Sequence, residues 1–305
     1  MINSNIVIPS SVSLNKTMNT LTVDDTDTLI ATVSPSNATN KNVQWSTSNS
    51  NVATVDEAGK VTAIGVGTAT ITATTIDGNK AASCTITVTD IVTFKDKNLE
   101  QAVRNAINKP TGTIFKSDVA HITYLHLYNK NISDISGIEN LSSLQTLDLE
   151  NNQISDISAM NGLTNLQFLN LDLNGISDIS ALKELTNLQD LYLDSNRISD
   201  FSALKGLINL KYLKLIDNQI SDISVLKELT NLQELYLSNN EISDISALRG
   251  LTNLHQLELM NNQISDINAL TGLTNLLDLG LTGNQISAVD QQKLKTALPN
   301  CEILF

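Results

Sequence analysis

The residues whose spacing most suggests chemistry are aspartates that recur at a fixed interval. Carboxylates repeated one structural unit apart could bind a row of hard cations, which prefer oxygen ligands. Each of these aspartates lies in an S-D-I-S, S-D-F-S or S-D-I-N sequence, a context typical of side chains that cap free backbone N–H groups. We therefore expect caps and predict no metal site. The seven aspartates stand 22 residues apart: Asp134, Asp156, Asp178, Asp200, Asp222, Asp244 and Asp266.

The other chemically capable side chains do not form a catalytic arrangement. His121, His126 and His255 lie outside any H-E-x-x-H sequence, and neither a G-x-S-x-G motif nor a P-loop is present. His126 and Asp148 could be neighbours on adjacent strands, but no nucleophile accompanies them. The acids at 24, 25 and 27 fit a solvated turn better than a cation site. We expect no catalytic residue, no enzyme activity and no cofactor.

The two cysteines also lack the spacing of a redox or metal site. Cys84 and Cys301 stand far apart in the chain and close to the ends of two different kinds of sequence. A disulfide between them is not expected, and we predict two packed thiols.

A repeat of 22 residues dominates the chain from Val119 onward. Eight copies begin at 119, 141, 163, 185, 207, 229, 251 and 273. Aliphatic residues fall at positions 1, 4, 7, 9, 14, 17 and 20 of most copies. The alternation around positions 7 and 9 predicts a short strand, and the later spacings of three predict a tight turn or 3₁₀ segment. Each copy cannot bury its apolar residues alone, so the copies must stack as a solenoid.

Position 12 of the repeat is asparagine in seven copies, from Asn152 to Asn284, and only the first copy differs, with Lys130. An inward asparagine can donate and accept hydrogen bonds where the strand turns. We expect a structural ladder of amides in preference to a row of binding groups.

The pattern LxxLxLxxNxISDIxxL resembles the internalin-type leucine-rich repeat of bacterial surface proteins, and the resemblance covers residues 94–305. Phe94–Gly112 is similar to the helical N-terminal cap of that family. Asp96 is a suitable helix N-cap, with Leu99, Val103 and Ile107 on one face, and Pro110 follows the helix. At the other end we expect Asp290 to cap a helix that Pro299 ends, with the last residues running along the final coil.

The first 90 residues are a different kind of sequence. They are rich in Thr, Val, Ser and Ala, with alternating runs such as Val61–Gly78. Residues 5–90 resemble the bacterial Ig-like domain, group 2, with Trp45 as the expected core aromatic. The predicted fold is therefore β-rich and has two domains, an Ig-like β-sandwich followed by a right-handed leucine-rich-repeat solenoid. The solenoid has a parallel concave sheet, a 3₁₀ and loop convex side, and helical caps. The expected boundaries are 1–90 for the sandwich, 91–118 for the N-terminal cap, 119–289 for the repeats and 290–305 for the C-terminal cap.

Charge narrows the class of partner. Residues 1–90 have seven acids and four bases, whereas residues 91–305 have 25 acids and 15 bases, so the solenoid carries most of the net charge of −13. This balance argues against nucleic acid and anionic membranes. No signal peptide, membrane span or sorting motif is present, and we expect such segments elsewhere in a longer protein that is secreted or held on the bacterial cell surface.

The variable positions of the repeat are the best candidates for function. Positions 6, 8 and 10 flank the strand leucines and should point away from the core, onto the concave sheet. All five tyrosines of the chain fall on these positions, together with eight acids and one lysine. Tyrosine is favoured at interfaces, although it also favours strands in general. The predicted ligand-binding residues are Tyr124, His126, Tyr128, Asp148, Glu150, Phe168, Asp172, Asp190, Tyr192, Asp194, Tyr212, Lys214, Glu234, Tyr236 and Glu258.

Two functions remain open from the sequence. The first, which the resemblance implies, is a non-catalytic recognition or adhesion module that binds a protein on its concave face, with the Ig-like domain as a spacer. The partner would be a protein, such as a host surface protein, or a glycan, and we expect a monomer without direct membrane insertion. The second is an ancillary structural or glycan-binding region of a larger secreted enzyme or cell-wall protein.

Overall fold

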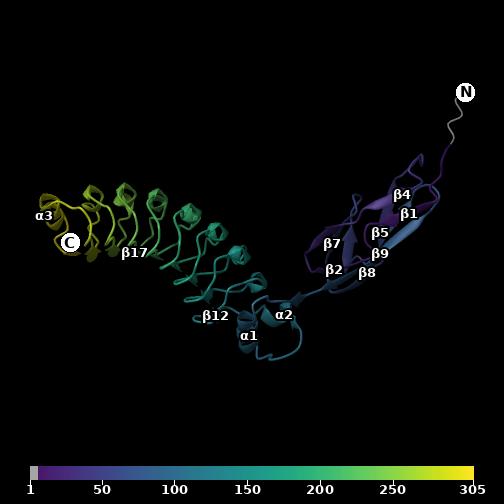
Figure 1. The fold of residues 1–305 in the computed structure, drawn as a ribbon, viewed down its shortest axis with the longest axis horizontal. Helices are drawn as coiled ribbons and strands as arrows, with labels where there is room; N and C mark the ends of the chain where they lie inside the picture. Colours follow the sequence, from purple (N-terminus) through teal and green to yellow (C-terminus); the bar gives the residue numbers. More distant parts are fainter. Residues whose placement is uncertain (1–5) are drawn as a thin grey trace, which may run out of the picture. The chain divides into compact units, whose positions relative to one another are not determined.

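The computed structural model describes residues 6–305. Residues 1–5, which the predicted Ig-like domain includes, lie outside this described part. The chain forms two compact units, one that ends at Ile91 and one that covers Val92–Phe305 (Figure 1).

The first unit is built from strands in small sheets. Strands β2, β9, β8 and β5 form a four-stranded sheet in that order, β3, β7 and β6 form a second sheet, and β1 pairs with β4. The bounds are β1 (Ser11–Leu14), β2 (Met18–Thr22), β3 (Thr26–Thr28), β4 (Ala31–Ser34), β5 (Val43–Thr47), β6 (Ala53–Val55), β7 (Lys60–Ala63), β8 (Gly67–Thr75) and β9 (Ala81–Thr89).

The core of this unit follows from alternation along its strands. In β8, Ala69, Ile71 and Ala73 are buried while the threonines between them are half-buried, as expected for a strand with one face on a core. Trp45 differs from the prediction of a core aromatic, because it is only half-buried and packs against the edge of this core. Its ring lies over Gly59, which has a φ of +81° and leaves space for the ring. Asp27 accepts hydrogen bonds from Lys16 and Asn19.

The second unit begins with a cap that contains a predicted helix and an unpredicted sheet. Strands β10 (Ile91–Val92) and β11 (Ile114–Phe115) pair, and helices α1 (Lys97–Ala106) and α2 (Lys116–Val119) accompany them. Asp96 is the N-cap of α1, as predicted, and accepts from the backbone N–H of Asn98 at 2.8 Å. Its other carboxylate oxygen accepts from the backbone N–H of Ser133 at 2.9 Å, so the same residue fastens the cap to the first repeat.

Each repeat contributes one short strand to a parallel sheet of nine strands, one more than the eight repeats. Neighbouring strands pair 22 residues apart, for example Leu125 with Leu147 and Leu147 with Leu169. The ninth strand comes from the C-terminal cap. The strands are β12 (Tyr124–His126), β13 (Thr146–Asp148), β14 (Phe168–Asn170), β15 (Asp190–Tyr192), β16 (Tyr212–Lys214), β17 (Glu234–Tyr236), β18 (Gln256–Glu258), β19 (Asp278–Gly280) and β20 (Glu302–Leu304).

The opposite side of the solenoid is made of short 3₁₀ segments. Figure 1 shows the strands on the inner side of the arc and these segments on its outer side. The leucines and isoleucines at the seven aliphatic positions fill the space between the two sides as one continuous core. The segments are η1 (Ile138–Asn140), η2 (Ser158–Met160), η3 (Ser180–Leu182), η4 (Ser202–Gly206), η5 (Ser224–Glu228), η6 (Ser246–Gly250) and η7 (Asn268–Leu270).

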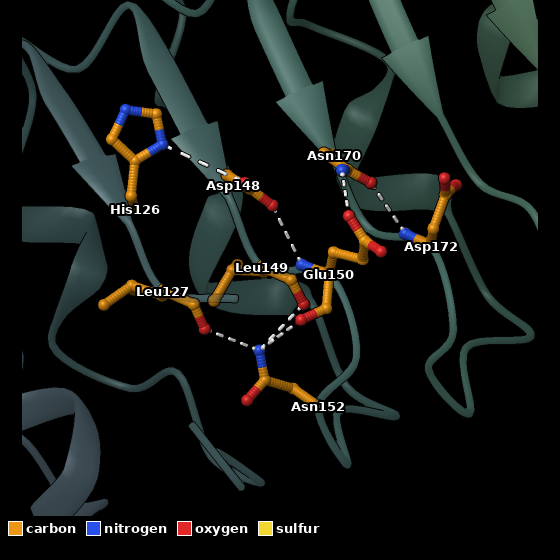
Figure 2. Close-up of polar contacts among 8 residues, drawn as sticks. All are labelled: His126, Leu127, Asp148, Leu149, Glu150, Asn152, Asn170 and Asp172. Atoms are coloured by element: carbon orange, nitrogen blue, oxygen red, sulfur yellow. Dashed lines mark hydrogen bonds and ion pairs between the residues drawn. The ribbon is translucent and has the colours of Figure 1, made fainter. Parts of the chain in front are cut away.

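Two ladders of asparagine hold the coils together. The position 12 ladder was predicted. Figure 2 shows its first member, Asn152, whose Nδ2 donates to the carbonyl oxygens of Leu127 and Leu149, each at 2.9 Å. A second ladder at position 3 was not predicted. There the Asn165 side chain donates to the carbonyl of Ser142 at 2.8 Å, and five later copies repeat the bond, at Asn187, Asn209, Asn231, Asn253 and Asn275.

The C-terminal cap corrects one sequence prediction. Helix α3 (Ala288–Ala297) begins after Ser287, whose hydroxyl accepts from the backbone N–H of Asp290 at 3.1 Å. Asp290 is therefore not the N-cap. It occupies the third helical position, where its carboxylate accepts from the Ser287 hydroxyl at 2.6 Å. Leu294, inside the helix, and Leu298, its C-cap residue, are both buried.

Candidate functional site

The inner face of the solenoid carries the predicted ligand-binding residues. Positions 6 and 8 lie on either side of a buried leucine in each strand, so their side chains leave the sheet on the face opposite to the core. Position 10 follows just after the strand. We call the side chains at these three positions of β12–β19 the concave face. All 15 predicted residues lie on it. Tyr124, His126 and Tyr128 are exposed, and the others are half-buried.

The N-terminal end of the concave face is open. Tyr124 is 67% exposed and Tyr128 is 59% exposed. The ring of Tyr124 stands 6.1 Å from that of His126. Figure 2 marks the contact between His126 Nδ1 and the Asp148 carboxylate. The two groups are 3.9 Å apart. A contact of this length at an exposed site contributes little to stability, so this end offers aromatic surface without a rigid polar frame.

Farther along, polar side chains form a connected chain across two neighbouring coils (Figure 2). The Asp148 carboxylate accepts from the backbone N–H of Glu150 at 3.1 Å. Asn170 donates to the Glu150 carboxylate at 3.2 Å and accepts from the backbone N–H of Asp172 at 3.0 Å. Asn170 is buried and was not among the predicted site residues. Its position as the one amide at position 8 was the signal available in the sequence.

Asp172 and Asp194 continue this chain as carboxylates that bridge coils. Asp172 accepts from the backbone N–H of Asp194, and Asp194 accepts from that of Ile216, both at 2.7 Å. Burial, together with the charges of Asp194 and Glu150, raises the pKa of Asp172 to about 7. Burial also raises the pKa of Asp194. Both groups therefore hold protons more tightly than an ordinary aspartate.

An aromatic cluster surrounds a lysine at the middle of the concave face. The Lys214 ammonium lies 5.1 Å from the ring centroid of Tyr192 and 5.1 Å from that of Tyr236. Tyr192 also packs against Phe168, with ring centroids 5.3 Å apart. The Tyr236 hydroxyl donates to the Glu234 carboxylate at 2.6 Å, and burial and this bond raise the pKa of Tyr236. The cluster is thus a preorganised surface of rings around one cation.

The outer aspartates act on their own backbone. In the second copy the Asp156 carboxylate accepts from the backbone N–H of Ser158 at 2.8 Å. The five later copies repeat this bond with the residue two positions on. The bonded N–H belongs to the first residue of the 3₁₀ segment, so each aspartate stands one residue before the N-cap position. The predicted capping role is confirmed, with this shift of one residue.

Three further observations concern the described residues, 6–305. Among residues 6–305, no three His, Cys, Asp or Glu side chains are grouped so that they could hold a metal ion. None of the helices in the same part of the chain has both the length and the apolar character needed to span a lipid bilayer. Cys84 is buried and Cys301 half-buried, and both are free thiols.

Comparison with known proteins identifies both units. Residues 9–86 match the bacterial Ig-like domain (group 2), and residues 121–162, 164–206, 208–250 and 230–272 match leucine-rich repeats. The structure is similar to internalin C2 of Listeria monocytogenes, with 37% sequence identity and a TM-score of 0.66, over 69% of this chain and 93% of that one.

Curated relatives match over shorter stretches. An uncharacterised protein of Clostridium acetobutylicum is 50% identical over 88 residues, which cover 28% of this chain and 9% of that protein. An alpha-L-arabinofuranosidase of Bifidobacterium longum subsp. longum is 42% identical over 90 residues, covering 28% of this chain and 8% of that protein. The chain thus spans less than a tenth of each of these relatives, and the enzyme is related only through an Ig-like part.

The domains found in the chain are of non-catalytic kinds and are typical of protein-interaction or surface modules. The predicted fold, an Ig-like domain followed by a leucine-rich-repeat solenoid, is confirmed. Because its repeats are similar in sequence and structure to nearly the whole of an internalin, this chain belongs to the internalin-type leucine-rich-repeat proteins and carries a bacterial Ig-like domain before its repeats.

Proposed function

We propose that this chain is a non-catalytic recognition module that works outside the bacterial cell, on its surface or after secretion, and binds a protein on its concave face. The Ig-like domain, residues 1–90, acts as a spacer for the repeats. The repeats with their caps form the binding domain.

One observation carries this proposal. All five tyrosines of the chain lie on the concave face, whereas the strand-rich Ig-like unit has none. Tyrosine buries a large area while its hydroxyl stays paired, which makes it a common anchor at protein interfaces. Nine strands at a spacing of about 4.8 Å span roughly 40 Å, enough to seat a protein domain.

The test compares how tightly two double variants bind a protein partner that has first been selected by its binding to the wild-type chain. Tyr192→Ala with Tyr236→Ala removes both rings that flank Lys214. Lys205→Ala with Lys227→Ala changes exposed side chains on the outer segments η4 and η5 and serves as the matched control. We expect the tyrosine pair to weaken binding at least tenfold and the lysine pair to leave it unchanged, measured by calorimetry on variants with unaltered melting curves. Equal binding by the tyrosine variant would contradict the concave-face assignment.

A second function is favoured by one specific observation. Glycosidases of Bifidobacterium longum subsp. longum are 42–44% identical to short parts of this chain. Here the chain would be an ancillary region that positions a catalytic domain or binds a glycan. A catalytic domain beside these residues in the full-length protein, together with binding to a glycan array in preference to any protein, would favour this alternative.

A further inference from the structure

Six side chains at the middle of the concave face form a compact pattern, which we call the central block. They come from three consecutive strands, β15, β16 and β17. Asp190 is in register with Tyr212 and Tyr212 with Glu234, while Tyr192 is in register with Lys214 and Lys214 with Tyr236. One row is therefore acid, tyrosine, acid, and the other is tyrosine, lysine, tyrosine. All six side chains are half-buried.

The lysine row presents a cation that is held but not neutralised. The Lys214 ammonium sits 5.1 Å from a tyrosine ring on each side. Within residues 6–305, no hydrogen bond or ion pair engages this ammonium. Its charge acts on the carboxylates of Asp172 and Asp194 only through space, where it partly offsets the rise in their pKa. Two rings restrict the side chain, so its N–H donors can meet an acceptor from outside with little further ordering.

The tyrosine row presents the opposite charge. Asp190 and Glu234 stand on either side of Tyr212, about 5 Å away along the sheet by ordinary strand spacing. Burial raises the pKa of Asp190, Lys211 lowers it and Glu234 raises it. Lys211 itself donates to the Gln189 side chain at 3.0 Å. A cation placed over the Tyr212 ring would meet the ring face and two carboxylates together.

The separation of the two rows determines what can bind both. The two rows are made by positions 6 and 8 of the same strands. Within one strand these two positions are about 6.6–6.8 Å apart. In an extended ligand segment that runs along these strands, side chains at i and i+2 point to the same side with the same separation. The two rows therefore match two side chains of opposite charge that are two residues apart.

We propose that the central block recognises an extended protein segment that carries a basic side chain and an acidic side chain two residues apart. The basic group lies over Tyr212 between Asp190 and Glu234, and the acidic group pairs with Lys214. This inference rests on the proposed function and specifies its partner. It differs from simple attraction of cations to an acidic surface, because Lys214 repels a second basic group at the place where the acidic one would bind.

The experiment uses the full chain labelled with 3-fluorotyrosine and observed by ¹⁹F NMR. Every tyrosine of the chain lies on the concave face, so each of the five signals reports on it. The probes are blocked decapeptides of glycine and serine that contain Arg-Ser-Asp, Arg-Ser-Arg or Gln-Ser-Asn, titrated at low ionic strength. Single Tyr→Phe variants assign the signals. Because an extended peptide can lie in either direction, one order of the charged pair is sufficient.

We expect Arg-Ser-Asp to shift the signals of Tyr192, Tyr212 and Tyr236, leave those of Tyr124 and Tyr128 in place, and bind about two- to fivefold more tightly than the other two peptides. Lys214→Gln should remove this preference and strengthen binding of Arg-Ser-Arg. Lys205→Gln, an exposed lysine on the outer segment η4, is the matched control and should keep the preference.

Tighter binding of Arg-Ser-Arg by the wild-type chain would overturn the inference, since the face would then respond to net charge alone. An unchanged preference in Lys214→Gln, or no shift at millimolar Arg-Ser-Asp, would overturn it as well. These failures are distinct from failure of the proposed function. The proposed function would fail if the Tyr192→Ala and Tyr236→Ala double variant kept its binding to a protein partner.

Discussion

The Asp172 carboxylate accepts a hydrogen bond from the backbone N–H of Asp194, one coil further along, at 2.7 Å. Asp194 does the same for the following coil, so two half-buried acids stand beside each other in the stack. Each carboxylate stabilises the coil that follows it while losing solvation and facing a like charge. The carboxylates of the concave face therefore support the neighbouring coils through hydrogen bonds, but their charges are unfavourable at neutral pH.

The first prediction concerns the dependence of stability on pH. The pKa of Asp172 is about 7 in the folded chain, against about 3.9 in the unfolded one. The native state thus binds more protons between these values, and its stability falls as pH rises from about 4 to about 7. Asp172→Asn keeps an acceptor for the Asp194 N–H without the charge. We expect it to stabilise the chain by on the order of 2 kcal/mol at pH 8 and hardly at all at pH 4.

Urea denaturation of both proteins at the two pH values measures this difference. Asp178→Asn is the matched control on the outer side, where the Ser180 backbone N–H lowers the pKa of the aspartate. The effect of Asp178→Asn on stability should have the opposite sign, with a loss of stability at pH 8. A gain of the same size at pH 4 and pH 8 in Asp172→Asn would show that charge is not the cause.

The second prediction separates the two asparagine ladders. Asn196 is buried, donates to the Leu171 carbonyl at 2.9 Å and accepts from the Ile176 backbone N–H at 3.0 Å. Asn196→Ala leaves these groups unpaired in the core and should cost about 1–3 kcal/mol of the free energy of unfolding. Asn187→Ala removes an exposed bond to the Thr164 carbonyl, which water can replace. Thermal or urea unfolding should show a clearly smaller loss for Asn187→Ala, and equal losses would contradict the distinction.

The third prediction uses a leucine in an unfavourable backbone conformation. Leu173 has a φ of +55°, and position 11 of each other copy, also at positive φ, carries Asn, Ser, Asp or Gly. A leucine in this region is strained, whereas asparagine adopts it more readily. Because Leu173 is 47% exposed, Leu173→Asn should raise the free energy of unfolding by about 0.5–1 kcal/mol. Leu277→Asn, at an exposed leucine without positive φ, should give no such gain. Calorimetric unfolding scans of both variants measure the difference.

The fourth prediction tests which residue begins the last helix. The Ser287 hydroxyl caps α3 by accepting from the Asp290 backbone N–H. Ser287→Ala should therefore cost about 1 kcal/mol, detected as a lower melting temperature of the repeat unit. Asp290→Asn retains a side-chain partner for the serine hydroxyl and should cost less. A larger loss in Asp290→Asn would restore the aspartate as the more important cap.

Much of the fold follows from the 22-residue period. Seven aliphatic positions per copy form the continuous core, position 12 supplies the amide ladder, and the helix that starts after Asp96 covers the first coil. The position 3 ladder was not predicted because an exposed asparagine next to a core leucine looks like an ordinary loop residue. Its partner is a carbonyl 23 residues earlier, which no local pattern indicates.

The candidate site was predictable as a set of positions but not as an arrangement. Periodicity placed all five tyrosines on one face, because alternate side chains of a strand share a face. It did not show that Lys214 lies between two rings, that Asn170 is buried, or that Asp172 is desolvated enough to raise its pKa to about 7.

The same division explains the errors. Ser287 and Asp290 are both suitable caps in a linear sequence, and the backbone conformation of Ser287, extended with a ψ of 149°, decides between them. The sequence alone thus determines which residues enter the core and which face outward, since periodicity and polarity act residue by residue. Only the tertiary structure decides which outward groups meet, how deeply they are buried and how their charges interact, because these depend on contacts between coils.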